Sequence, residues 1–139
     1  MLESLQIRNY VLIDSLDIRF PEGLIIISGQ TGAGKSILLG ALSLLLGSKA
    51  DASVIGGEAD SCVVEAVFRI PESDLVLKEI LDDNDVEAGD GELIIRRVVN
   101  RSGRSRSFIN DSPVNIQILQ SISSRLVDIH SQHQTLLLL

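Results

Sequence analysis

The feature that most constrains this fold is a glycine-rich segment that lies between two apolar runs. Residues 29–36 read G-Q-T-G-A-G-K-S, which fits the phosphate-binding P-loop pattern G-x-x-x-x-G-K-[ST]. The apolar run 24–28 before it predicts a buried strand, and the run 37–46 after it, ended by Gly47, predicts a buried helix. Strand, loop and helix stand in the order that a phosphate-binding loop requires. The segment therefore predicts an α/β protein with a nucleoside triphosphate site.

Each part of the loop has an expected role. The glycines let backbone N–H groups point inward at phosphate oxygens, and the helix N-terminus adds a partial positive charge. We expect Lys35 to contact the β- and γ-phosphates and the Ser36 hydroxyl to bind Mg²⁺. A chance glycine-rich turn is the alternative, and the shared register of loop, lysine, hydroxyl and helix argues against it. The predicted nucleotide-binding residues are Gly29, Gln30, Thr31, Gly32, Ala33, Gly34, Lys35 and Ser36.

Length and composition fit one domain with an aliphatic core. The chain has 139 residues, of which 45% are hydrophobic and only 3% are aromatic. The net charge of −7 is concentrated in residues 72–92, which hold nine acids and one lysine, so the remainder is nearly neutral. The acidic balance argues weakly against a dedicated nucleic-acid module. Cys62 is the only cysteine, which excludes a disulfide framework and predicts a small buried thiol.

Periodicity places the other elements. Alternating residues predict strands at 3–10 and 16–20, joined as a hairpin, and further strands at 61–70, 93–100 and 107–109. Helices are predicted at 72–81 and at 114–126, with Asn115 as the cap of the second. A hairpin ahead of the P-loop strand predicts a mixed sheet with antiparallel hairpins around a buried P-loop helix. The remaining expectations are loops at 48–60 and 82–92, turns at 21–23, 101–104 and 110–113, and a strand at 126–130.

Arginines gather in the predicted hairpin 93–109, a stretch without any acid. Two interpretations stay open: the guanidinium groups bind DNA phosphates or acids of a partner, or they pair with the carboxylates of residues 72–92. The acids of residues 82–92 lack metal-ligand spacing, which favours a solvated loop over a metal site. The five arginines, of twelve basic residues in all, are Arg96, Arg97, Arg101, Arg104 and Arg106.

Hydrolysis needs more than a P-loop, because an acidic residue must follow a second buried strand and water must be positioned. Asp128 follows only Leu126 and Val127, so it is a weak candidate. Either this is a self-contained small P-loop NTPase or kinase that uses Asp128, or the catalytic half lies beyond residue 139. The four terminal leucines, taken as an apolar stop inside a larger protein, favour the second interpretation. A scaffold with a vestigial P-loop is a third.

Several segments carry a family resemblance. Residues 5–10 (L-Q-I-R-N-Y), 20–24 (F-P-E-G-L) and 29–39 resemble the N-terminal head segment of SMC-like ATPases. Residues 101–110 (R-S-G-R-S-R-S-F-I-N) and 126–133 (L-V-D-I-H-S-Q-H) are similar to the RecN family of bacterial DNA repair proteins. The chain departs from Rad50 and SMC relatives at Val11 and Leu12, where an arginine and a serine commonly help to bind nucleotide. That contact is not carried over.

The resemblance implies an ABC-type ATPase head of which residues 1–139 form the N-terminal half, with the coiled coil and the C-terminal half absent. It implies ATP and Mg²⁺ as cofactors, with Lys35 and Gln132 as catalytic residues. Gln132 would be the glutamine-loop residue that contacts Mg²⁺ or the attacking water; Gln134 in its place, or a polar turn, are the alternatives. Lys49 would act near the phosphates.

The resemblance also implies partners and a setting. Hydrolysis would require the missing half and a second copy of the head, and DNA would be the substrate of double-strand break repair and recombination. No signal peptide or membrane-spanning run stands in the sequence. We therefore expect a cytoplasmic, nucleoid-associated protein without a membrane partner.

Overall fold

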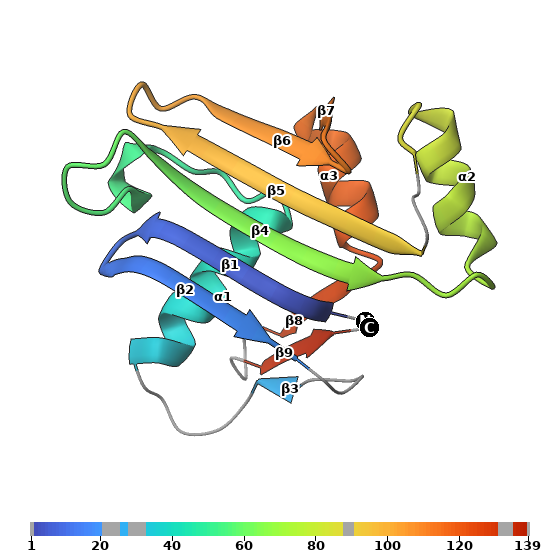
Figure 1. Ribbon diagram of the computed structural model, residues 1–139, viewed down its shortest axis with the longest axis horizontal. Helices are drawn as coiled ribbons and strands as arrows, with labels where there is room; N and C mark the ends of the chain where they lie inside the picture. The colour runs from blue at the N-terminus through green and yellow to red at the C-terminus, as the bar shows by residue number, and fades with distance from the viewer. Residues whose placement is uncertain (1, 21–25, 28–32, 88–90, 131–134, 139) are drawn as a thin grey trace.

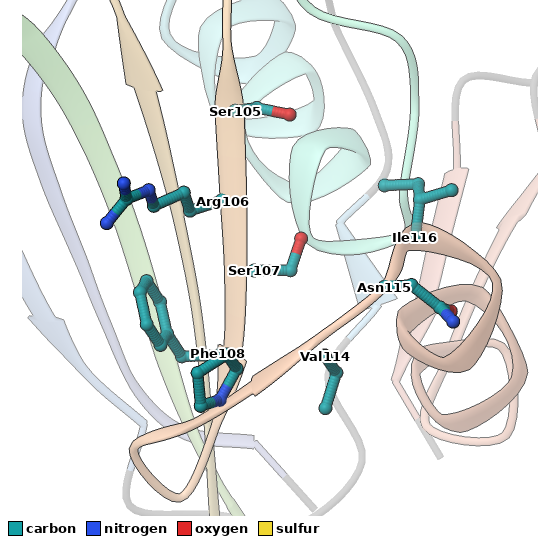
Figure 2. Close-up of a pocket in the computed structure, with 8 residues that line it drawn as sticks. Ser105, Arg106, Ser107, Phe108, Val114, Asn115 and Ile116 are labelled. Atoms are coloured by element: carbon teal, nitrogen blue, oxygen red, sulfur yellow. The ribbon is translucent and has the colours of Figure 1, made fainter.

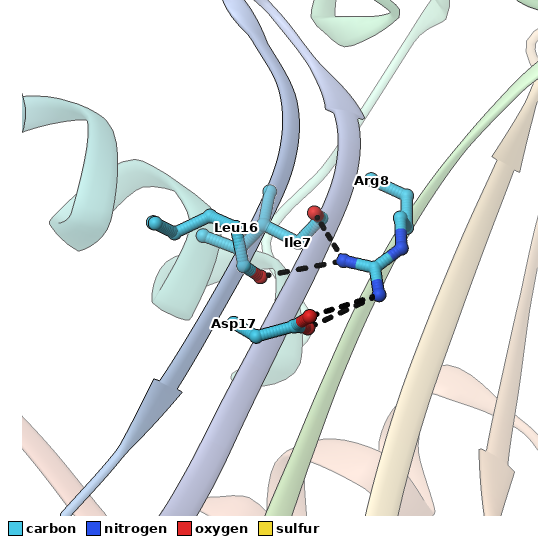
Figure 3. Close-up of polar contacts among 4 residues, drawn as sticks. All are labelled: Ile7, Arg8, Leu16 and Asp17. Carbon is cyan, nitrogen blue, oxygen red and sulfur yellow. Dashed lines mark hydrogen bonds and ion pairs between the residues drawn. The ribbon is translucent and has the colours of Figure 1, made fainter.

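An antiparallel hairpin opens the chain, as the alternation predicted. The computed structural model describes residues 2–20, 26–27, 33–87, 91–130 and 135–138. Strands β1 (Leu2–Tyr10) and β2 (Ile13–Arg19) pair through a turn in which Asn9 and Val11 have positive φ angles. Arg8 fastens this hairpin: its guanidinium donates to the carbonyl oxygens of Ile7 and Leu16 and pairs with Asp17 at 3.1 Å (Figure 3).

Six strands form the main sheet, in the order β2-β1-β4-β5-β6-β7 (Figure 1). The added strands are β4 (Ser61–Arg69), β5 (Glu92–Asn100), β6 (Ser105–Ile109) and β7 (Ser112–Val114). A second sheet has the order β3-β9-β8, from β3 (Ile26–Ile27), β8 (Val127–His130) and β9 (Thr135–Leu138). All pairings between described strands are antiparallel, so the expected hairpins are confirmed and no parallel pair lies within the described residues.

One face of the main sheet carries the core. Every second residue of β4 is buried there, from Cys62 to Phe68, and β5 contributes Leu93, Ile95 and Val99 to the same face. Helix α1 (Ala33–Leu45) packs against β4 and β5, and α3 (Ile116–Ser123) packs against β6 and α1. Figure 1 shows both helices behind the sheet, while α2 (Leu75–Asp83) lies beyond the ends of β4 and β5. The predicted aliphatic core is confirmed.

Three local predictions need correction. The segment 48–60 is not all loop, because a 3₁₀ turn, η1 (Ala52–Val54), precedes Ile55, which is buried and bridges to Tyr10. The turn predicted at 110–113 is shorter: Asn110 and Asp111 take positive φ, as a two-residue hairpin requires, and Ser112 already belongs to β7. No strand was predicted near the terminal leucines, yet Leu136, Leu137 and Leu138 lie in β9, since an apolar run without alternation does not distinguish a strand from an irregular end.

Candidate nucleotide-binding site

A strand and a helix flank the predicted phosphate loop. Strand β3 ends at Ile27, and α1 begins at Ala33, inside the motif itself. The first turn of α1 contains no acidic residue, and the side chain of Ser36 is exposed there. A helix N-terminus without nearby carboxylates favours an anion, because its unbonded N–H groups and its dipole both carry positive charge.

The individual loop roles stay predictions. Gly29, Gln30, Thr31 and Gly32 lie outside the described residues, as do Gln132 and Gln134. The backbone of Ala33, Gly34 and Lys35 forms the start of α1, but the Lys35 side chain is outside the description. Asp128 lies in β8, again without a described side chain.

Lys49 lies at the far end of the P-loop helix. Helix α1 has 13 residues, which separates its two ends by about 20 Å. The exposed Lys49 follows the C-terminal end, together with Gly47 and Ala50. Within this chain Lys49 therefore lies far from the start of α1, where the phosphates are predicted to bind, and this distance argues against its expected role there.

Tyr10 contacts the middle of α1. Its side chain is buried, and its hydroxyl oxygen lies so close to Gly40 that a Cβ at position 40 would clash with it. Burial raises the pKa of the Tyr10 phenol above its ordinary value, with Cys62 as a smaller cause. The absence of a side chain at position 40 thus lets β1 approach the P-loop helix closely. Tyr10 therefore belongs to the core between β1 and α1.

The carbonyl groups at the C-terminal end of α1 accept hydrogen bonds from the residue after the helix stop and from α3. Gly47 has a φ of +90°, and the Ser48 N–H donates to the Ser43 carbonyl at 3.1 Å, which is a glycine-based helix stop. Gln120 of α3 donates from Nε2 to the Gly47 carbonyl at 3.2 Å. These bonds satisfy carbonyl groups that a helix end leaves without internal partners.

Arg97 is the buried member of the arginine group. Only 3% of it is exposed, and its Nη1 donates to the Leu44 carbonyl at 2.9 Å and to the Ser48 carbonyl. Nη2 donates to Ser105 Oγ at 3.3 Å, while Nε has no hydrogen-bond partner among the described residues. Burial lowers the pKa of the guanidinium below its ordinary value. Arg97 therefore links β5 to the end of the P-loop helix.

Among the described residues, the other arginines of the hairpin have partners outside residues 72–92 or are exposed, which argues against the second of the two open interpretations. Arg96 lies on the opposite face from Arg97, between Glu65 at 3.7 Å and Asp111 at 3.4 Å, and 4.7 Å above the Phe108 ring. Adjacent strand residues point to opposite faces, which the sequence reasoning did not apply to this pair. Arg101 donates to the carbonyls of Ala59 and Gly57, and Arg104 and Arg106 are exposed.

Neither Cys62 nor the acidic residues form a further site in the described part of the chain. Cys62 is buried, as expected, and burial raises the pKa of its thiol to about 11. In the described ranges, no three His, Cys, Asp or Glu side chains gather closely enough to hold a metal ion. Nor does any helix in those ranges have the length and apolar character needed to cross a membrane.

Comparison with known proteins gives the family. The model of the family described as AAA domain matches residues 4–139. The chain belongs to the AAA domain family. Among curated relatives, the DNA repair protein RecN of Vibrio cholerae is 39% identical over 133 residues, which are 96% of this chain and 24% of the relative. RecN of Synechocystis is 43% identical over 97% of this chain and 23% of the relative. The expected resemblance to RecN is confirmed, and the chain spans about a quarter of these relatives' length.

Solved structures of SMC and RecF proteins share the fold. A structure from work on ATP-driven dimerisation and DNA-stimulated activation of SMC ATPases gives a TM-score of 0.65 at 21% identity, over 88% of this chain and 77% of that one. The SMC head domain from Thermotoga maritima gives 0.57 at 24% identity, over 90% and 41%. The recombination mediator RecF gives 0.61 at 16% identity, over 86% and 29%. The chain therefore shares its fold with part of these SMC and RecF proteins.

Proposed function

We propose that this chain is the ATP-binding part of an SMC-like ATPase that acts in repair of DNA double-strand breaks and in recombination. The observation that carries the proposal is the start of α1 at Ala33, within the P-loop motif and with no acid in its first turn. The relatives named RecN and the fold shared with SMC and RecF heads support it. ATP would bind along residues 29–36, with Lys35 at the β- and γ-phosphates.

Mg²⁺ belongs to the proposal as the partner of the phosphates. The exposed Ser36 in the first turn of α1 would contribute its hydroxyl to the ion, and Gln132 would supply a second oxygen. The metal's chemistry would be to neutralise charge that develops on the phosphates during transfer. Residues 1–139 would form the N-terminal half of the head.

Turnover would require parts that this chain does not supply. We expect DNA, a C-terminal half-head and a second copy of the head as partners of the full-length protein, in the cytoplasm at the nucleoid. The structure of SMC ATPases noted above is described by ATP-driven dimerisation and DNA-stimulated activation, which supports this expectation by likeness of fold. The 139-residue chain alone should therefore bind ATP with negligible hydrolysis.

Binding of a fluorescent ATP analogue to the full-length protein tests the proposal. Lys35→Ala should weaken binding about tenfold or more, because a charge-assisted contact to phosphate is removed. The matched control is Lys78→Ala, which removes the same charge from α2 and should leave the affinity unchanged. Unchanged binding by Lys35→Ala, or no binding by the parent, would contradict the proposal. Robust Mg²⁺-dependent hydrolysis by the isolated chain that Asp128→Asn abolishes would favour the self-contained enzyme instead.

A further inference from the structure

A groove lies between β6, the C-terminal end of α1 and the start of α3. Two adjoining depressions of about 340 Å³ and about 460 Å³ form it, and both have Ser105 and Ile116 in their walls. Figure 2 shows the Ser105 and Ser107 hydroxyls on the side of β6 that faces the helices, with Arg106 and Phe108 on the other side. The groove thus has a hydroxyl-lined wall on the helix-facing side of the sheet.

Four of the seven residues that line the larger depression have side-chain hydrogen-bond donors, and none of the seven is acidic. Its lining residues are Gly47, Lys49, Ala50, Arg97, Ser105, Ile116 and Gln120. The carboxylate closest in sequence belongs to Asp51; it accepts hydrogen bonds from the N–H and the hydroxyl of Ser53, and Lys49 attracts it electrostatically from the rim of the depression. The side chains that carry charge into this space are therefore both cations, Lys49 and Arg97.

Arg97 is a buried cation with N–H groups that lack hydrogen-bond partners among the described residues. A guanidinium has five N–H donors. Three hydrogen bonds of Arg97 are accounted for by the carbonyls of Leu44 and Ser48 and by Ser105 Oγ. Nε has no partner, and no carboxylate lies against the group among the described residues. The carbonyls at the C-terminal end of α1 offset part of the Arg97 charge, but no carboxylate pairs with it among the described residues, so an anion beside it would offset the rest.

Helix α3 adds partial positive charge at the same place. Asn115 caps it by accepting from the Ile118 N–H at 2.8 Å. The N–H groups of Ile116 and Gln117 belong to a first turn, which has no internal partners for them. Ile116 lines both depressions, so this helix start opens onto the groove. A helix N-terminus, a buried guanidinium and a lysine converge on one space.

We propose that this groove is a binding site for a phosphate group, with Lys49, Arg97 and Ser105 as the hydrogen-bond donors. It is separate from the P-loop, because the 13 residues of α1 hold the two sites about 20 Å apart. The phosphate comes either from a small phosphate compound or from the backbone of a nucleic acid, which both present the same oxygens. The alternative is a purely structural Arg97 that only caps α1.

Pyrophosphate binding to the full-length protein, measured by isothermal titration calorimetry, tests the site. The measurements are made in the Lys35→Ala background, which disables the P-loop. There, Lys49→Glu should weaken binding about tenfold or more and Ser105→Ala more modestly, because a charged donor and a neutral donor are removed. Lys78→Glu makes the same charge change on α2 and should have no effect. These variants leave Arg97 in place, so a folding defect at position 97 does not enter.

A second arm identifies the source of the phosphate. A short single-stranded oligonucleotide that competes with pyrophosphate, and does so only when Lys49 is present, assigns the site to nucleic acid. Competition by inorganic phosphate but not by the oligonucleotide assigns it to a small phosphate compound. The proposal is overturned if pyrophosphate does not bind in the Lys35→Ala background, if Lys49→Glu binds as its parent does, or if Lys78→Glu loses as much. Each of these results leaves the ATP-binding proposal standing, because the P-loop is disabled throughout.

Discussion

The guanidinium of Arg97 donates to the carbonyl oxygen of Leu44 at 2.9 Å, which fastens the middle of β5 to the last turn of the P-loop helix. The same guanidinium donates to the Ser48 carbonyl beyond the helix stop. A positive charge at a helix C-terminus interacts favourably with the helix dipole. The position of α1 thus depends in part on a side chain from the sheet.

Replacing Arg97 by methionine should destabilise the protein. The substitution keeps most of the side-chain volume, but it leaves the buried carbonyl of Leu44 and the partly buried carbonyl of Ser48 without their donor. Each unsatisfied buried group costs about 1–3 kcal/mol, so the free energy of unfolding should fall by about 3 kcal/mol. Urea unfolding measures the change. Arg106→Met is the matched control, because Arg106 is exposed, and it should stay within about 0.5 kcal/mol of the parent. Equal losses would show that Arg97 contributes no specific bonds.

Much of the fold could be predicted because burial follows simple periods. Strands β4 and β5 alternate cleanly, since one face of each packs on α1 and the other is partly exposed. Asn115 was identified as a cap from its side chain and its place before an apolar helix, and its Oδ1 does accept from Ile118. In these cases the residue types and the local pattern agree with the tertiary structure.

The function of Arg97 was not predictable from charge counting. Its phase in β5 places it on the buried face, among Leu93, Ile95 and Val99, and that phase was visible in the sequence. What the sequence could not show is that helix carbonyls would accept its hydrogen bonds, since Leu44 lies 53 residues away. Strand β9 was missed for a similar reason: its pairing with β3 and β8 depends on distant segments.

Gly47 should be sensitive to substitution for two separable reasons. Its φ of +90° costs about 1–2 kcal/mol for any residue with a Cβ, and that Cβ would lie 2.4 Å from Cγ of Gln120. Gly103 has a φ of +85° with nothing within 4 Å, so Gly103→Ala measures the backbone cost alone. Gly47→Ala should lower the free energy of unfolding by about 1–3 kcal/mol more than Gly103→Ala does, as measured by thermal or urea unfolding. Gln120→Ala should remove that difference; if the difference persists, the contact with Gln120 is not its cause.

Gly40 and Tyr10 should be coupled in stability. An alanine in a helix interior normally stabilises by up to about 1 kcal/mol relative to glycine. At position 40 the added Cβ would meet the Tyr10 hydroxyl at 2.4 Å, and such overpacking costs about 1–3 kcal/mol. Gly40→Ala should therefore destabilise the parent by about 1 kcal/mol but stabilise Tyr10→Phe, which lacks the hydroxyl. The four unfolding free energies form a double-mutant cycle, and additive effects would contradict the contact.

Cys62 should make stability fall at alkaline pH. Its thiol has an ordinary pKa of 9.0, which applies to the unfolded chain, and burial raises the pKa to about 11 in the folded protein. Below pH 9 both states hold the proton and the contribution is fully present. Between about 9 and 11 the unfolded chain ionises first, so folding stability declines as pH rises. At pH 10 the free energy of unfolding should be lower than at pH 7 by about 1 kcal/mol from this group alone.

Urea unfolding of the parent and of Cys62→Ala at pH 7 and pH 10 isolates that thiol. Cys62→Ala should lower the free energy of unfolding at both pH values through lost packing. Because it has no thiol to ionise, its free energy of unfolding should fall less between pH 7 and pH 10 than that of the parent, by the amount given above. The Tyr10 phenol, whose pKa is also raised by burial, adds a loss of the same sign in both proteins, and Tyr10→Phe in each background removes it. Identical pH dependence of the parent and Cys62→Ala would mean that the thiol is reachable by water in the native state, against its full burial on β4.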